Sequence, residues 1–89
     1  MPYIKSERRP RFDAIVDVFK HMGAVAAVGD MVYLFTRLLV TWLPKEPTFD
    51  DYNTALGILE AAKLELYRRV VASYEDKKKE ENGDVYAWY

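Results

Sequence analysis

The sequence predicts an all-α protein, a small three-helix bundle with a long C-terminal helix. Three segments repeat apolar residues at the helical spacing of three and four positions. Glycine or proline separates the segments, and the second and third have capping residues or acids at their start. We expect residues 1–89 to form a single domain. A domain of this length buries only about 60% of the surface of its unfolded chain, so association with other chains is expected to add stability.

The first expected helix covers residues 11–22. Pro10 suits its first turn, Gly23 is placed to end it, and a short helical turn can begin ahead of it at Ser6. Its apolar positions are Phe12, Ile15, Val16, Phe19 and Met22.

The second expected helix covers about residues 28–42, with Asp30 near its positive end and Pro44 after it. It is apolar nearly all round, which is typical of a helix at the centre of a bundle or in an oligomer interface. Asp30 and Arg37 lie inside this apolar segment, and two charges there argue against a membrane span. Its apolar positions include Val28, Met31, Val32, Phe35, Leu38, Leu39 and Trp42.

The third expected helix begins near Thr48 or Asp50, either of which can cap it, and runs to about Tyr74 or Lys78. Gly57 in its middle costs about 1 kcal/mol against alanine, which suggests close approach of a second helix at Gly57 and Ala61.

The C-terminal segment begins with an Asn82-Gly83 turn signal. Residues 84–89 have a strand-like composition. We expect them either to pair with residues 3–5 in a short extended contact of the two ends, or to lie on the bundle.

The composition excludes several kinds of site. There is no cysteine and only one histidine, His21, so a thiolate or multi-histidine metal site within the chain is excluded. The net charge of −1 gives no indication of bulk nucleic-acid binding. Asp13 and Asp17 share one helical face and are interpreted as solvated. We therefore expect no cofactor and no enzymatic activity.

Arg37 and Asp30 form the most informative charged pair, because buried charge is costly unless it is paired. One interpretation is an ion pair, with each other or with the third helix. The other is that Arg37 contacts an anionic ligand, with the ring of Tyr33 one turn away.

Arg68 and Arg69 also have two interpretations, as salt-bridge partners or as ligand contacts. They can form salt bridges, with Glu65 as a partner, while Glu60 pairs with Lys63. Alternatively, they form a basic and aromatic patch suited to phosphates and bases, if an oligomer brings several copies together.

Three blocks of sequence carry a resemblance: MPYIK followed by ERR, GDMVYLFTRLL, and GILEAAKLELYRRVVASYEDKKKEENGDVY. They resemble a family of small uncharacterised proteins from phages and bacterial genomes. Its members often end at the equivalent of NGDVY, and they tend to carry Asn where this chain has Val32. The resemblance implies a phage or prophage accessory protein and no particular activity.

These observations favour a non-enzymatic binding protein that forms a homo-oligomer through its second or third helix, in the cytoplasm of the host cell if a phage encodes it. The narrowly preferred role is capture of a small anionic nucleotide, such as an immune signal, between subunits. The alternative is a protein–protein interaction module that inhibits a host protein, marked by a flat aromatic patch without a pocket and by exposure of Trp42 and Trp88. The expected ligand contacts are Tyr33, Arg37, Arg68 and Arg69, with Lys5 and Arg8 as additions.

Overall fold

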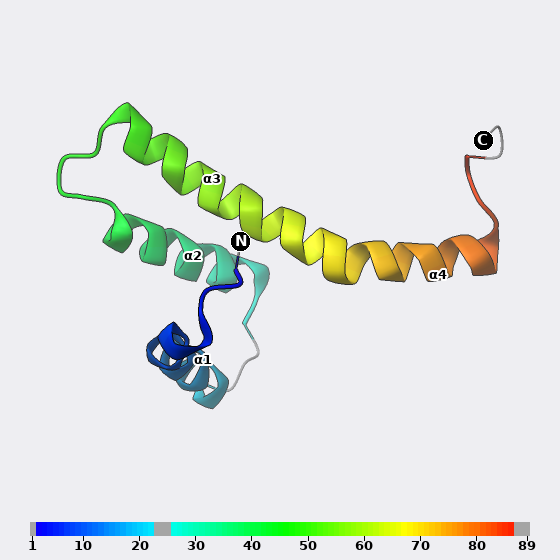
Figure 1. Cartoon of the computed structure of the whole chain (residues 1–89), viewed down its shortest axis with the longest axis horizontal. Coiled ribbons are helices and arrows are strands. Elements are labelled where there is room, and N and C mark those ends of the chain that lie inside the picture. The colour runs from blue at the N-terminus through cyan, green and yellow to red at the C-terminus, as the bar shows by residue number, and fades with distance from the viewer. Residues whose placement is uncertain (1, 23–25, 87–89) are drawn as a thin grey trace. The chain divides into compact units, whose positions relative to one another are not determined.

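The computed structural model describes residues 2–22 and 26–86, and within these ranges it contains helices and no strand. The elements are η1 (Ser6–Arg8), α1 (Pro10–His21), α2 (Val28–Trp42), α3 (Phe49–Leu66), η2 (Tyr67–Val71) and α4 (Ala72–Asn82). The last three follow one another without a break as a helical run of 34 residues (Figure 1). The all-α class and the long C-terminal helix are therefore confirmed.

The chain forms two compact units, and the border between them falls inside α3. One unit comprises residues 3–56, with η1, α1, α2 and the first turns of α3. The described part of the other comprises Pro2 and residues 57–86. The expectation of a single domain stays a prediction.

Two helical segments, η1 and α1, follow each other directly at the beginning of the first unit. In η1 the Arg8 N–H donates to the Lys5 carbonyl oxygen at 2.9 Å, and the Arg9 Nε–H donates to the Ile4 oxygen at 2.9 Å. Pro10 then occupies the first turn of α1, where its missing N–H costs no hydrogen bond. The predicted helical turn and first helix are confirmed to within one residue, while Gly23, expected to end α1, lies outside the described residues.

The bounds of α2 agree with the prediction, and local polar groups fix the starts of both α2 and α3. Asp30 Oδ2 accepts a hydrogen bond of 2.9 Å from the Ala27 N–H. At the start of α3 the Thr48 N–H donates to Asp51 Oδ2 at 2.8 Å, and the Asp51 N–H donates to Thr48 Oγ1 at 3.3 Å. This reciprocal arrangement is a capping box, and it identifies Thr48 as the cap of α3.

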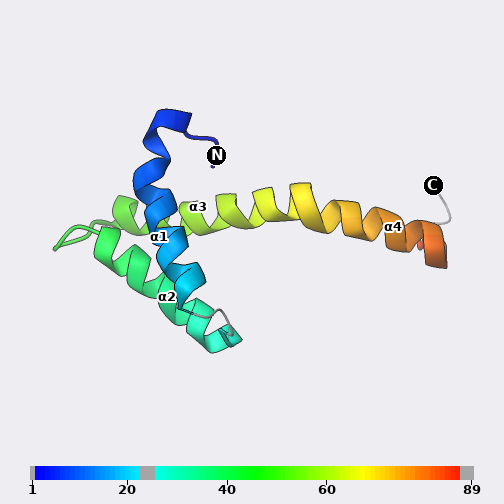
Figure 2. The ribbon, with the colours of Figure 1, turned by 90° about the horizontal axis from the view of Figure 1, so that it is seen from below.

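Residues 43–48 join α2 to α3, so that α2 and the first turns of α3 form the two arms of a hairpin (Figure 1). Figure 2, turned by 90°, shows α1 inclined to α2. Both arms and α1 belong to the first unit.

In the second unit the helical run ends later than expected, at Asn82 instead of near Tyr74 or Lys78. The extension is supported by an ion pair of 3.3 Å between Lys78 and Glu81 and by the Lys78 ammonium 5.5 Å from the centre of the Tyr74 ring. Gly83 stops the helix at φ 90°, a backbone conformation that residues with a Cβ rarely adopt, so the predicted turn is found there.

Burial is slight throughout the described residues, among which Ala55 is the only buried side chain. Most of α2 is exposed, so a central position for this helix, one of its two expected settings, is not seen in the isolated chain. A Cβ added at Gly57 would meet no atom within 4 Å, so the close approach expected there is not found among the described residues either. The described ends of the chain carry no strand, and residues 87–89 lie outside the described part.

Candidate functional site

An apolar groove lies between α1 and α2 in the first unit, with a volume of about 490 Å³. Met31, Leu34 and Leu38 contribute the α2 wall, where Asp30 and Tyr33 are the polar members. Sequence reasoning found most of these residues as members of helical stripes, but it did not place the two helices beside a common groove. Residues of and beside α1 complete the lining: Ile15, Val18, Phe19, Met22 and Ala26.

The groove side of α2 carries two opposite charges without an ion pair between them. Asp30 caps the helix start, as described above. Arg37 is exposed, and its guanidinium makes no hydrogen bond or ion pair with any residue that the structure describes. Asp30 and Arg37 therefore do not form the ion pair with each other that one interpretation of the sequence suggested, because Asp30 lies nearly two helical turns away and turns its carboxylate to the backbone of Ala27.

A second feature of α2 is a row of apolar side chains, which we call the α2 stripe: Val28, Val32, Phe35, Leu39 and Trp42. These positions follow the spacing i, i+4, i+7, i+11, i+14 and so share one helical face. Val28 is 83% exposed and Trp42 is 53% exposed. Exposure of Trp42 is one of the marks expected of a protein–protein interaction module, whereas the groove beside α1 departs from the expected surface without a pocket. The exposure expected for Trp88 lies outside the described residues.

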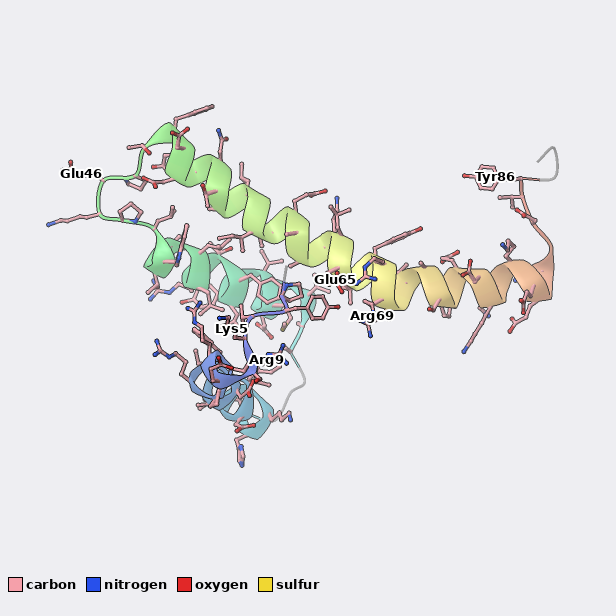
Figure 3. All side chains as sticks on the ribbon, in the orientation of Figure 1. Lys5, Arg9, Glu46, Glu65, Arg69 and Tyr86 are labelled. Carbon is pink, nitrogen blue, oxygen red and sulfur yellow. The ribbon has the colours of Figure 1, made fainter. Side chains whose placement is uncertain are left out.

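In the second unit Arg68 and Arg69 lie in η2, a π-helical segment inside the long helical run. Arg68 Nη2 lies 2.8 Å from Glu65 Oε1, and Lys63 pairs with Glu60 at 3.0 Å. Figure 3 shows Glu65 and Arg69 on neighbouring turns. The predicted salt bridges are therefore present, and the positive charge expected for a phosphate-binding patch is partly balanced by Glu65. π-Helical segments such as η2 are often found at functional sites, and the sequence gives no signal for this one.

The six predicted ligand contacts are divided between the two units. Tyr33, Arg37, Lys5 and Arg8 belong to residues 3–56, whereas Arg68 and Arg69 belong to the second unit. Within the first unit Tyr33 lies on the groove and is 68% exposed, with Arg37 one turn further along α2. Lys5 precedes η1 and Arg8 is its last residue, and both are exposed.

A second hollow, with a volume of about 690 Å³, lies along α4 and the residues after it. Glu75 and Lys79 contribute charges of both signs, and Tyr67 and Val71 contribute apolar surface. The turn at Gly83 brings Val85 and Tyr86 into its lining, and the Tyr86 N–H donates to Asp84 Oδ1 at 2.8 Å. Sequence reasoning did not find this hollow, because its shape depends on the direction of the chain after Gly83.

The acidic residues and the single histidine do not form a metal cluster within residues 2–22 and 26–86. Asp13 and Asp17 are exposed on α1, as interpreted from the sequence. The His21 Nδ1–H donates to the Asp17 carbonyl oxygen at 2.8 Å, so this imidazole is tied to the C-terminal turn of its own helix. No described helix is long and apolar enough to span a membrane.

The fold and these surfaces define a small helical protein with exposed apolar faces and no group of metal-ligating side chains among its described residues. The chain belongs to the family described as a domain of unknown function, DUF6899, which matches residues 1–85. Comparison with curated proteins and with solved structures gives no match. The family agrees with the resemblance to uncharacterised proteins, and it names no activity.

Proposed function

We propose that this protein is a non-enzymatic binding protein that attaches to another protein through the α2 stripe. The observation that carries the proposal is the exposure of four of the five stripe residues, with Leu39 half-buried between them, in a chain whose described residues bury only Ala55. Exposed apolar side chains that form a continuous row mark interaction surfaces, whereas isolated ones are ordinary.

The chemistry of the α2 stripe suits a protein partner better than a small polar ligand. Burying a valine, leucine or phenylalanine side chain stabilises a complex by about 1.5–3 kcal/mol. Tryptophan and phenylalanine are enriched in protein interfaces, and a central tryptophan often dominates the binding free energy. Phe35 and Trp42, two turns apart on the stripe, are the expected anchors.

The resemblance to phage and bacterial proteins suggests the biological setting. We propose a phage accessory protein that binds and inhibits a host protein, such as a defence protein, in stoichiometric amounts. A protein acting in this way needs a specific surface and no catalytic group, which is consistent with the exposed α2 stripe.

The test is capture of a host protein by the tagged chain and by two matched variants. Phe35→Glu places a charge in the α2 stripe and should abolish capture, because a carboxylate buried in an apolar interface is costly. Thr36→Glu places the same charge on the neighbouring exposed residue, outside the stripe, and should retain capture. Circular dichroism of both variants checks that α2 remains helical. Equal capture by Phe35→Glu and the unmodified chain would contradict the proposal.

A second candidate is capture of a small anionic nucleotide, and the exposed Arg37 beside Tyr33 favours it. A guanidinium suits phosphate, and an aromatic ring suits a base. Arg68 and Arg69 contribute to such a site only if association brings copies of the chain together.

Native mass spectrometry of the protein purified from its host tests this second candidate. An oligomer should carry an additional small mass that is released on denaturation. Arg37→Ala should lose that mass without loss of helicity, while Lys45→Ala, which removes an exposed cation outside α2, should retain it. Retention of the mass by Arg37→Ala would exclude Arg37 as a contact.

A further inference from the structure

The groove side of α2 carries one acidic and one basic side chain, so this surface is electrostatically complementary to a second copy of itself. Asp30 and Arg37 are seven residues apart, which is nearly two helical turns, so both project from the same side of the helix. The Arg37 guanidinium has no partner among the described residues, and Asp30 uses only Oδ2 in its bond to the Ala27 N–H. One carboxylate oxygen and one guanidinium therefore remain available on the same exposed surface.

We propose that two copies of this chain associate by antiparallel packing of α2 against α2, centred between Tyr33 and Leu34. In this register Asp30 lies opposite the partner subunit's Arg37, and Arg37 lies opposite the partner subunit's Asp30. A two-fold axis requires such reciprocity, because each contact occurs twice. A parallel arrangement would instead place Asp30 against Asp30 and Arg37 against Arg37.

The groove explains why a helix of a second copy fits on this side. Leu34 and Leu38 line the groove together with Ile15 and Phe19 of α1, so a helix packed on α2 also covers apolar residues of α1. Helices in contact lie about 8–10 Å apart, a spacing that brings facing side chains together. The result is a four-helix arrangement in which each α1 covers the α2 of the other copy.

The apolar surface of the groove is also open to a second copy. Among its lining residues, five large apolar or aromatic side chains are exposed: Ile15, Val18, Met22, Tyr33 and Leu38. Pairing through α2 covers the groove side and leaves the α2 stripe on another face of the helix. In this dimer the anion that meets Arg37 is a carboxylate of the second copy and not a nucleotide phosphate.

Charge exchange between two variants of the full chain tests the register. Arg37→Glu alone and Asp30→Lys alone each replace two attractive contacts in the dimer by two repulsive contacts. Each should raise the dissociation constant about a hundredfold. An equimolar mixture should form a heterodimer, because the introduced lysine then meets the introduced glutamate, and the remaining Asp30 meets the remaining Arg37. Sedimentation velocity measures the species, and circular dichroism checks helicity, since Asp30→Lys also removes a helix cap.

Unchanged dimers of Arg37→Glu would overturn the proposal, as would two monomeric variants that fail to associate when mixed. If a dimer of the unmodified chain dissociates on removal of a bound nucleotide, while Arg37→Glu prevents nucleotide binding, the phosphate and not Asp30 is the partner of Arg37. Failure of this test leaves the host-protein capture experiment unaffected, because that experiment uses the α2 stripe.

Crosslinking gives a second measurement that does not depend on the helix cap. The chain has no cysteine, so a single introduced cysteine is unique. Tyr33→Cys lies beside the proposed axis and should form a covalent dimer with a short bismaleimide. Val40→Cys, which is also exposed on α2, is the matched control. In the proposed register the two thiols of this control lie about 20 Å apart along the helices and should not crosslink. Crosslinking of Val40→Cys but not Tyr33→Cys would overturn the register.

Discussion

Individual polar side chains define where the helices of this protein begin. Thr48 and Asp51 satisfy each other's backbone N–H groups at the start of α3, and Asp30 performs half of this role at the start of α2. These contacts are local in sequence, so a search for capping residues can identify them in advance. The partner of Arg37, in contrast, cannot be identified from spacing alone.

The capping box leads to a prediction about stability. Thr48→Ala should lower the free energy of unfolding by about 1 kcal/mol, because the Asp51 N–H loses its acceptor. Thr54→Ala is the control, since Thr54 Oγ1 donates only to the Asp50 carbonyl oxygen within α3, a bond that adds little to helix stability. Urea unfolding followed by circular dichroism, at one protein concentration, measures both. A Thr54→Ala effect as large as that of Thr48→Ala would contradict the assignment of the cap.

The ion pair between Arg68 and Glu65 leads to a prediction about Arg68. The Arg68 side chain is 62% exposed, although that of Glu65 is only 19% exposed, and an arginine this open to solvent contributes little through one ion pair. Arg68→Ala should therefore change the free energy of unfolding by less than about 0.5 kcal/mol. Lys63→Ala, which removes the exposed pair of Lys63 with Glu60, should have a similarly small effect in the same unfolding experiment. A loss above about 2 kcal/mol for Arg68→Ala would show a structural role that the exposed pair does not account for.

Among the helices, the long C-terminal run is the one whose extent the sequence underestimated. Its apolar periodicity ends near Tyr74, but helix-forming Glu and Lys residues and the Lys78–Glu81 pair continue it to Asn82. The π-helical segment η2 has no sequence signature at all, because it depends on how the backbone hydrogen bonds shift within a continuous helix.

Gly57 leads to a prediction about α3 itself. Gly57→Ala should raise the free energy of unfolding by about 1 kcal/mol, because alanine is the better helix former and its Cβ meets no atom within 4 Å. Ala61→Gly, one turn further along, should lower the free energy of unfolding by a similar amount. Thermal unfolding of the two variants at equal concentration measures both effects. Dissociation or destabilisation of Gly57→Ala would instead show that another chain approaches α3 at this glycine.

For the whole chain, the main finding is the shortage of buried side chains, with Ala55 alone buried among the described residues. A chain of this length has a small core even when it is fully packed, and its net stability is a small difference between large terms. Association is therefore expected to contribute much of the stability of the folded state.

This expectation can be measured as a dependence on concentration. The midpoint of thermal unfolding should rise as the protein concentration is raised about a hundredfold, because mass action favours a folded oligomer over unfolded monomers. Arg37→Glu should lower the midpoint at each concentration if the proposed α2 contact supplies that association. A midpoint that stays constant over the whole range would show that the isolated chain is stable by itself.

The sequence by itself determined the helical class, the bounds of α1 and α2 to within one residue, two candidate caps for α3, of which Thr48 is the one used, and the turn at Gly83. All of these depend on interactions between residues close in sequence, through helical periodicity, capping and backbone conformation. Only the tertiary structure decided that Tyr33 and Asp30 lie on a groove with α1, and that the Arg37 guanidinium is left without a partner among the described residues. These features depend on how separate helices meet, and the same apolar stripes are compatible with several such arrangements.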